Sequence, residues 1–296
     1  MSAKNVVLIV DDVALNVKVL VNLLKDTYEL KIATDGQRAL ELAQSEPIPD
    51  LILLDIVMPD MDGYEVLESL KITSLTKNIP VIFVTASSSI NDEEKGLNLG
   101  AVDYITKPIS PAIVLARIKT HLTIKLQHDE LLYNASHDQL TGMYNRHMLS
   151  EVGQRKFARA LRQGTKLSAI ILDIDHFKNV NDTYGHLAGD KVLITIANAL
   201  KNNMRIEDFS ARFGGEEFII ILENCDALNA KEKAEFLREK IQEADTNGVQ
   251  VTSSFGICEL DENHTDFDSL LKDADKALYK AKENGRNKVE IFTMLD

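Results

Sequence analysis

Short apolar segments that end at polar residues recur through the first part of the chain. Residues 6–10 are all apolar and precede two aspartates, and residues 51–54 precede a third. Such runs are typical of parallel strands that are buried on both faces of a sheet. Further strands are expected at 30–34, 81–85 and 104–107. With helices between them, the pattern predicts an α/β domain with a doubly wound, five-stranded parallel sheet.

Helical periodicity separates these strands at 14–25 and 37–44. The first helix is amphipathic, so its apolar side chains should face the sheet. The side chains expected there are Leu15, Val19, Leu20, Leu23 and Leu24.

Polar residues stand where four of the expected strands end. Asp11 and Asp12 follow the first strand, Asp55 the third, Thr85 the fourth and Lys107 the fifth. Ligands of such sheets bind at the carboxyl ends of the strands, so these groups should converge. Three neighbouring carboxylates repel one another unless a cation lies among them, and Mg²⁺ prefers oxygen ligands. The alternative is a set of solvated acids at loop starts, which five polar groups at four strand ends disfavour.

Residues 4–121 resemble the receiver domain of two-component response regulators. The matching residues are Asp11-Asp12, Asp55, Met58-Pro59-Asp60-Met61-Asp62-Gly63, Thr85-Ala86 and Lys107-Pro108. The resemblance implies that Asp55 accepts a phosphoryl group from a cognate histidine kinase or phosphotransfer protein. It also implies a Mg²⁺ site formed by Asp11, Asp12, Asp55 and the Val57 carbonyl.

We place the receiver domain at residues 1–121. The same resemblance also assigns its switch residues. Lys107 would pair with the phosphoryl oxygens, and the Lys107–Pro108 peptide is expected to be cis. Thr85 would turn toward the phosphate, and Tyr104 would rotate inward behind it.

A segment without glycine or proline follows, from 112 to 137. Its 26 residues would span ~39 Å as one helix. The apolar positions form two broken stripes rather than one heptad seam. Beyond Leu122 the receiver is complete, so the remaining helix needs another apolar surface, which a parallel coiled coil in a homodimer would supply. The alternative is a single helix packed on its own domain.

The rest of the chain, 138–296, mixes strands and helices without strict alternation. Helices are expected at 146–163, 192–204, 227–244 and 267–283. Strands are expected at 169–174, 209–213, 218–222, 249–258 and 289–292. This order favours an α+β domain with an antiparallel sheet.

A glycine pair, Gly214-Gly215, joins two of these strands. It predicts a tight hairpin with the two glycines as its turn residues, because both can adopt positive φ. Glu216 and Glu217 follow, and a turn without side chains beside two acids lets a polyphosphate approach while a carboxylate holds its metal. On these residues alone, an ordinary hairpin with exposed glutamates is an equal alternative.

Four blocks of sequence, 138–146, 169–190, 212–218 and 281–287, resemble the GGDEF family of diguanylate cyclases in its GGEEF variant. The resemblance implies a palm-like nucleotidyl cyclase fold and the condensation of two GTP into cyclic di-GMP and two pyrophosphates. Mg²⁺ or Mn²⁺ would neutralise charge on the phosphates. By residue-level match, Asp173 and Glu216 hold the metal with the Ile174 carbonyl, and Glu217 accepts the 3′-hydroxyl proton.

The remaining matches concern nucleotide binding. Lys178, Lys282 and Arg286 would bind phosphates, with Lys282 and Arg286 one helical turn apart. Asn181 and Asp190 match guanine-reading positions, and a carboxylate suits the N1–H and N2–H₂ donors that guanine has and adenine lacks. The other substrate-binding residues implied are Phe177, Gly214 and Gly215. The family's product-inhibition site matches Arg205 and Asp208, with Arg238 as a further contact.

Bulk properties narrow the function. A net charge of −13 disfavours a nucleic-acid-binding surface, and the chain shows neither a signal-peptide pattern nor a membrane-spanning run, so a cytoplasmic protein is expected. Cys225 and Cys258 are expected to be buried free thiols. Four histidines, His147, His176, His186 and His264, lack metal-ligand spacing and are expected to be structural or exposed. The alternatives to a cyclase are a non-catalytic effector that binds cyclic di-GMP and a DNA-binding response regulator.

Overall fold

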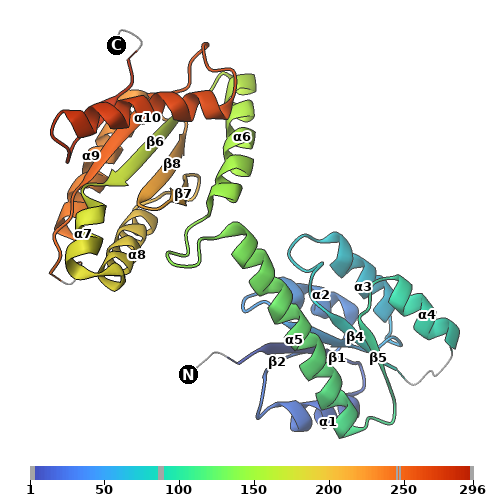
Figure 1. Cartoon of the computed structure of the whole chain (residues 1–296). Helices are drawn as coiled ribbons and strands as arrows, with labels where there is room; N and C mark the ends of the chain where they lie inside the picture. Colours follow the sequence, from blue (N-terminus) through green and yellow to red (C-terminus); the bar gives the residue numbers. More distant parts are fainter. Residues whose placement is uncertain (1–3, 86–89, 245, 247, 294–296) are drawn as a thin grey trace. The chain divides into compact units, whose positions relative to one another are not determined.

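The computed structural model describes residues 4–85, 90–244, 246 and 248–293. The chain divides into two compact units, Met1–Leu131 and Leu132–Asp296. Each unit contains one five-stranded sheet with helices on both faces (Figure 1).

The sheet of the first unit is parallel throughout, as predicted. Its strand order is β2-β1-β3-β4-β5, which places β1 and β3 side by side. The strands are β1 (Val6–Val10), β2 (Glu29–Ala33), β3 (Leu51–Leu54), β4 (Val81–Thr85) and β5 (Asp103–Thr106). Every residue of β1, β3 and β4 is buried, which explains their unbroken apolar sequences.

Two hydrophobic clusters lie on the two faces of this sheet. Helices α2 (Gly36–Gln44) and α3 (Gly63–Ile72) pack on one face. Helices α1 (Ala14–Leu24) and α5 (Pro111–Ser136) pack on the other, and α4 (Ile90–Asn98) follows β4.

The predicted inner face of α1 was partly wrong. Leu15 and Val19 are exposed, at 69% and 44%. The buried side chains are Val17, Leu20 and Leu24, which are spaced three and four residues apart. Residues at this spacing share one side of a helix, and Leu15 and Val19 fall on the opposite side.

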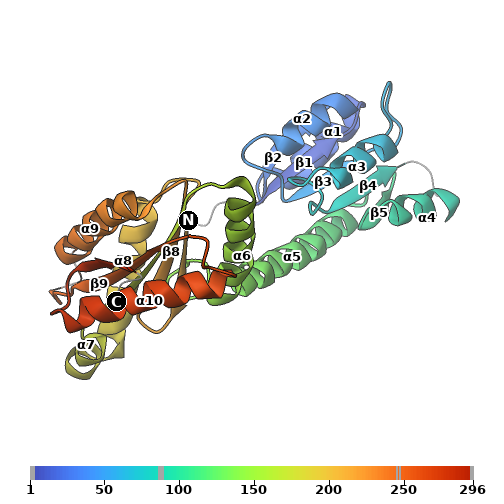
Figure 2. The same cartoon turned by 90° about the horizontal axis from the view of Figure 1, so that it is seen from above.

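Helix α5 is one unbroken helix, as expected (Figure 2). Its buried residues are Val114, Ile118 and Leu122, all in its first half. Leu126, Leu131 and Leu132 in the second half are exposed. The second half therefore presents apolar side chains to solvent within this chain, and its pairing as a coiled coil stays a prediction.

The second unit contains a mixed sheet with the order β10-β9-β6-β8-β7. Its strands are β6 (Leu167–Ile174), β7 (Phe209–Gly214), β8 (Glu217–Glu223), β9 (Ser253–Glu259) and β10 (Val289–Ile291). The neighbours of β6 and β8 are antiparallel, as expected, but β10 pairs with β9 in parallel. The strand expected from residue 249 begins only at Ser253.

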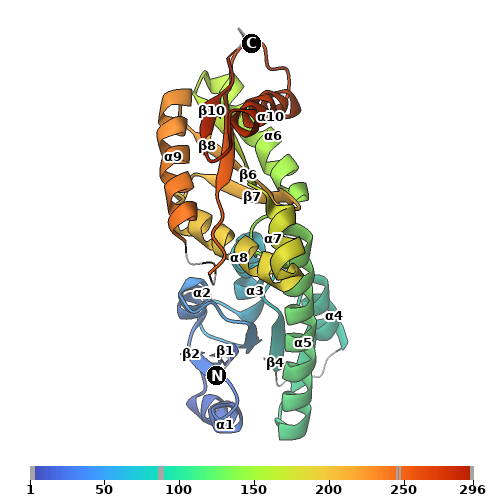
Figure 3. The same cartoon turned by 60° about the vertical axis from the view of Figure 1, so that its left-hand side comes forward.

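Alternate residues of β6 and β8 separate the two faces of this sheet. Ile170, Leu172 and Phe218 pack with α8 (His186–Asn202) and α9 (Ala227–Glu243). Ile171 and Ile219 pack with α6 (Arg146–Gln163) and α10 (Phe267–Glu283). Figure 3 shows α9 on one side of the sheet and α6 with α10 on the other.

Helix α7 (Phe177–Tyr184) was not predicted, and α8 begins six residues earlier than expected, at His186 rather than 192. Gly185 and Gly189 in this stretch resemble helix breakers. Gly185 does separate the two helices, at φ 83°. Gly189, in contrast, lies inside α8. A Cβ at this position would lie 2.0 Å from Oδ1 of Asn181 on α7, which explains why the residue is glycine.

Candidate functional site

The carboxyl ends of β1, β3 and β5 bring the predicted receiver residues together. The Lys107 ammonium lies 2.8 Å from Asp11 and 2.6 Å from Asp55. Oxygen atoms of Asp11, Asp12 and Asp55 lie within 4.8 Å of one another. Asp11 and Asp55 are buried, whereas Asp12 is exposed. Three carboxylates with one open side fit a hard divalent cation such as Mg²⁺.

The electrostatic environment of these carboxylates agrees with the binding of a cation. Burial raises the pKa of the Asp55 carboxyl and the Asp11 charge adds to the rise, although Lys107 opposes it. Asn16, which the sequence reasoning missed, donates from Nδ2 to both Asp11 oxygens at 3.0 Å. Asn16 lies five residues after Asp11, on the first turn of α1, and this short separation is the only feature of the sequence that points to the contact.

The switch residues occupy the same region. Thr85 is fully buried, and the Lys107–Pro108 peptide is cis, as expected. Tyr104 is 6% exposed, and its hydroxyl lies 3.3 Å from that of Tyr64. Tyr104 is therefore inward in this structure. Ala86, which belongs to the matching sequence block, lies outside the described residues.

The glycine pair forms the predicted hairpin, but with a different turn. Gly214 ends β7 and pairs with Glu217, so the two turn residues are Gly215 and Glu216. Of the two glycines only Gly215 has positive φ, at 49°. The prediction that the two glycines are the turn residues was therefore wrong, because the ladder extends one residue further than the pattern indicated.

Three carboxylates gather beside this turn. Asp173, the last residue but one of β6, lies directly opposite Glu217 of β8, so both side chains lie on one face of the sheet. Burial raises the pKa of Asp173, and the charge of Glu216 adds to the rise. Burial likewise raises the pKa of Glu217, with Asp173 as the next cause. This concentration of negative charge fits a divalent cation held by Asp173 and Glu216.

The three predicted phosphate-binding side chains lie on different parts of the domain. Lys282 Nζ, on α10, lies 2.9 Å from Oδ2 of Asp173. Lys178 is exposed in the first turn of α7. The expectation that Arg286 lies one helical turn after Lys282 was wrong, because α10 ends at Glu283 and Arg286 has φ 61° in the following loop.

The predicted guanine-binding residues lie on α7 and α8. Asn181 and Asp190 are half-buried, and Gly189 makes room for the Asn181 side chain. Phe177 is 7% exposed and packs in the core, so a contact between its side chain and substrate is disfavoured and its main chain remains the candidate.

Two interactions that the sequence reasoning missed hold the site in shape. Arg212 donates to Asp138 at 2.9 Å and to the Gly215 carbonyl at 3.0 and 2.7 Å, which fixes the hairpin to the start of the domain. Asp175 accepts hydrogen bonds from Ser254 and Thr252, at 2.6 and 2.7 Å, and from the Asn287 main chain. The sequence did contain a signal for these residues, because the blocks that match the family include Asp138, Arg212 and Asp175.

The predicted inhibitory site is an exposed turn ahead of β7. The Arg205 N–H donates to Asp208 Oδ2 at 3.0 Å, and the Arg205 side chain is exposed. Arg238 instead donates to Glu235 at 2.7 Å and to Asn287 at 3.0 Å, and lines a cavity of about 800 Å³ beside α7. No contact found among the described residues joins Arg238 to Arg205 or Asp208.

The other expected features are partly confirmed. Cys258 is buried, but Cys225 is only partly buried. His264 is buried, and together with Cys258 and Asp273 it forms a cluster that the spacing of the histidines did not reveal. None of the described helices is long and apolar enough to cross a membrane.

Comparisons with known proteins identify a family for each of the two units. A model of the diguanylate cyclase GGDEF domain matches residues 135–288, and one of the response regulator receiver domain matches 7–119. The response regulator PleD of Caulobacter vibrioides is 32% identical over 271 residues, which cover 87% of this chain and 59% of PleD. The diguanylate cyclase DosC of Escherichia coli is 33% identical over 212 residues, which cover 70% of this chain and 45% of DosC.

The chain thus spans about half the length of these curated relatives. Among solved structures, the coiled coil and GGDEF domain of DgcB from Caulobacter crescentus, in complex with c-di-GMP, has a TM-score of 0.55 at 30% identity. The match covers 61% of this chain and 98% of that chain. Because the GGDEF model matches more than half of the residues, this chain belongs to the GGDEF family, with a response regulator receiver domain ahead of its GGDEF domain.

Proposed function

We propose that this chain is a diguanylate cyclase response regulator, which condenses two GTP into cyclic di-GMP and two pyrophosphates under the control of its receiver. The observation that supports it most is the convergence of Asp173 and Glu217 with Lys282 at the end of β6, beside the Gly215 turn. Carboxylates and a cation together suit phosphoryl transfer, in which positioning and charge stabilisation do most of the catalysis.

Each predicted residue has a role in this reaction. Mg²⁺ or Mn²⁺ held by Asp173, Glu216 and the Ile174 carbonyl would neutralise charge on the phosphates. Glu217 accepts the proton of the attacking 3′-hydroxyl, because burial raises its pKa toward the range of a useful base. Its place opposite Asp173 keeps it on the reacting face of the sheet.

Substrate binding is shared by the loop and helices next to the carboxylates. The side chains of Lys178, Lys282 and Arg286 bind phosphate oxygens. Asn181 and Asp190 read the guanine edge. Gly215, with no side chain in a left-handed turn, lets the phosphates approach the main chain.

The receiver supplies regulation. An oxygen of Asp55 attacks phosphorus of a phosphohistidine on a kinase or phosphotransfer protein, and the P–N bond breaks. Mg²⁺ would be held by Asp11, Asp12, Asp55 and the Val57 carbonyl. Lys107, already 2.6 Å from Asp55, pairs with the phosphoryl oxygens. Because each cyclase domain has one set of GTP-binding residues and the reaction joins two GTP, the active form is a homodimer.

The test is incubation of the full chain with GTP and Mg²⁺, followed by nucleotide chromatography. Cyclic di-GMP and pyrophosphate should form, and Asp173→Asn and Glu216→Gln should abolish both while circular dichroism stays unchanged. Binding of cyclic di-GMP without turnover would instead favour the non-catalytic effector. Near-normal turnover by both variants would show that the metal assignment is wrong.

A further inference from the structure

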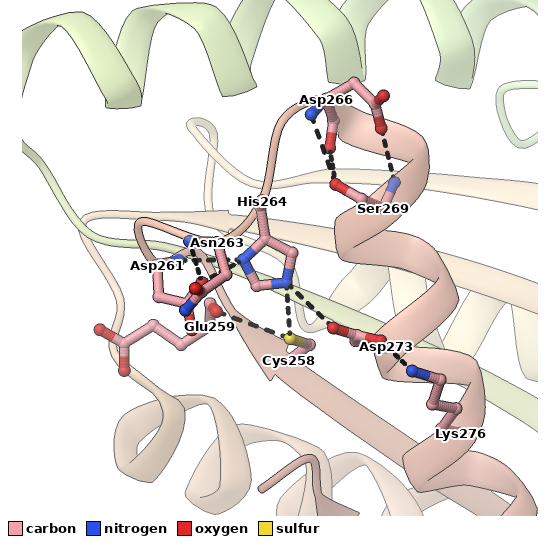
Figure 4. A network of polar contacts seen from close by, with 9 residues as sticks. All are labelled: Cys258, Glu259, Asp261, Asn263, His264, Asp266, Ser269, Asp273 and Lys276. Atoms are coloured by element: carbon pink, nitrogen blue, oxygen red, sulfur yellow. Dashed lines mark hydrogen bonds and ion pairs between the residues drawn. The ribbon is translucent and has the colours of Figure 1, made fainter. Parts of the chain in front are cut away.

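Away from the proposed catalytic site, three different metal-ligating groups meet in the second unit (Figure 4). Cys258 belongs to β9, His264 to the loop that follows and Asp273 to α10. The His264 Nε2 atom lies 3.5 Å from Cys258 Sγ and 3.5 Å from Asp273 Oδ2. A thiol, an imidazole and a carboxylate are a mixed donor set that borderline-soft metals prefer.

We propose that Cys258, His264 and Asp273 bind Zn²⁺. In a tetrahedral zinc site, sulfur and nitrogen ligands lie about 3.5 Å apart, and nitrogen and oxygen ligands about 3.3 Å apart. The two distances at His264 agree with these values to about 0.2 Å, the tolerance expected of a preformed site. Three protein ligands leave a fourth position for water.

The second nitrogen of His264 is arranged as zinc ligands require. Nδ1 lies 2.8 Å from Oδ1 of Asp261, and a carboxylate on Nδ1 keeps the proton there and turns the Nε2 lone pair toward the metal. The Asp261 N–H also lies 3.1 Å from Nδ1 and would need the opposite tautomer. We assign the proton to Nδ1 because the carboxylate contact is shorter and charge-assisted.

Burial and charge also favour a cation at this point. His264 and Cys258 are 4% and 2% exposed, so their polar atoms are withdrawn from water. Two carboxylates, Asp261 and Asp273, face His264, and among the described residues Lys276 is the cation that contacts them, at 2.7 Å from Asp273. A cavity of about 530 Å³ is lined by Cys258 and Asp261.

The same three residue types can also form a nucleophilic thiol triad, which this geometry disfavours. The Cys258 thiol is 2% exposed, so a substrate has little access to sulfur. Burial, followed by the charge of Asp273, raises the pKa of the thiol to about 12, so without a bound cation it carries no reactive thiolate.

A zinc ion here would join β9 to α10 through the loop between them. Strand β9 pairs with β6, which carries Asp173, and α10 carries Lys282. The proposed ion would therefore stabilise the packing of α10 on β9. It does not depend on the chain being a cyclase, and its test needs no nucleotide.

The experiment uses the full chain in reduced form, with Co²⁺ as a spectroscopic stand-in for Zn²⁺. Excess Mg²⁺ is present so that the carboxylates of the receiver and cyclase sites are occupied. We expect one Co²⁺ per chain with a thiolate-to-cobalt charge-transfer band and the intense visible bands of tetrahedral cobalt, both abolished by Zn²⁺. Cys225→Ser leaves Cys258 as the one remaining thiol and should keep the spectrum.

Cys258→Ser and His264→Gln should lose these bands and the rise in Tm that Zn²⁺ gives the wild type. Asp261→Asn should keep the bands at saturation but weaken Zn²⁺ binding ~10- to 100-fold. The proposal is overturned if wild type and Cys225→Ser both lack the charge-transfer band, or if the band survives in Cys258→Ser. The Cys225→Ser spectrum decides the matter even if the Cys258 variant does not fold.

Discussion

The ammonium of Lys282 lies 2.9 Å from the carboxylate of Asp173. A predicted phosphate ligand thus pairs with a predicted metal ligand. Burial raises the pKa of Asp173, the pair with Lys282 opposes the rise, and the charges of Glu216 and Asp175 add to it. A divalent cation held by Asp173 would repel Lys282, which would then be available to bind phosphate oxygens. The receiver has a parallel arrangement, in which Lys107 pairs with Asp11 and Asp55.

Lys282→Ala tests this exchange. Loss of one charged donor to a developing phosphate charge should lower kcat/KM for GTP on the order of 10²-fold. Steady-state rates with GTP and Mg²⁺ measure the effect. Lys231→Ala, an exposed lysine on α9, is the control and should retain the wild-type rate. An unchanged rate in Lys282→Ala would mean that the ion pair is structural only.

Most of the architecture could be predicted from local patterns, because buried strands and amphipathic helices each have a characteristic spacing of apolar residues. Helix α6 and helix α10 were predicted with their observed ends, at Arg146–Gln163 and Phe267–Glu283. Helix α7 was missed because Gly185 and Gly189 resemble loop residues, and only the tertiary contact between Gly189 and Asn181 explains the second glycine.

Sites whose members each stand beside a recognisable strand end or turn were predicted better than the site whose members carry no such signal. Asp173 and the hairpin glutamates were found because each stands beside a recognisable strand or turn. The Cys258–His264–Asp273 cluster was not, because its members come from a strand, a loop and a helix, and their spacing acquires meaning only when α10 packs on β9. Arg286 was misplaced because the end of α10 depends on the loop at Gly285, not on helix periodicity.

The Asp138 carboxylate should make stability depend on pH. Burial alone would raise the pKa of Asp138, but hydrogen bonds from Thr141 and the Arg212 pair outweigh burial and lower it. A depressed folded-state pKa contributes stability that is complete above the ordinary value of about 3.9 and is lost as pH falls through the folded-state pKa. Asp138→Asn should therefore lower Tm at pH 7, and its deficit should shrink toward about pH 3.

Thermal unfolding of wild type and variant across this pH range measures the difference. The exposed Asp182→Asn is the control and should follow the wild type throughout. A deficit that stays constant with pH would show that the Asp138 contribution is packing, not charge.

Arg205→Ala should relieve product inhibition. The exposed guanidinium of Arg205 can bind a guanine edge or phosphate, while Asp208 accepts from guanine. The variant should continue to form cyclic di-GMP at product concentrations that stop the wild type, with its initial rate unchanged. Arg238→Ala tests the third predicted contact separately, since Arg238 is held by Glu235 and Asn287. Progress curves that plateau alike for Arg205→Ala and wild type would place inhibition elsewhere.

The last prediction concerns how Asp55 controls the cyclase. Helix α5 runs without interruption from Pro111–Ser136, and its second half exposes Leu126, Leu131 and Leu132. Leu131 and Leu132 belong to the two different apolar stripes, so two such helices can pair in two ways, and a rigid pair transmits orientation. Misplacement of two reacting groups by even 1 Å can cost ~10²-fold in rate. We therefore expect phosphoryl-Asp55 to select, through Thr85 and Tyr104, the helix pairing that brings two GTP sites together.

Beryllofluoride, which mimics a phosphoryl group, should raise the rate of cyclic di-GMP formation, and Asp55→Asn should remove the response. Inserting four residues after Gln127 rotates the second half of α5 by ~40° and lengthens it by ~6 Å, which should uncouple the rate from beryllofluoride. Inserting seven residues restores the helical phase to within about 20° and should preserve the response. The two insertions separate orientation from length, because the longer one perturbs distance more and phase less. If both inserted proteins respond like the wild type, α5 acts only as a tether and orientation is not the signal.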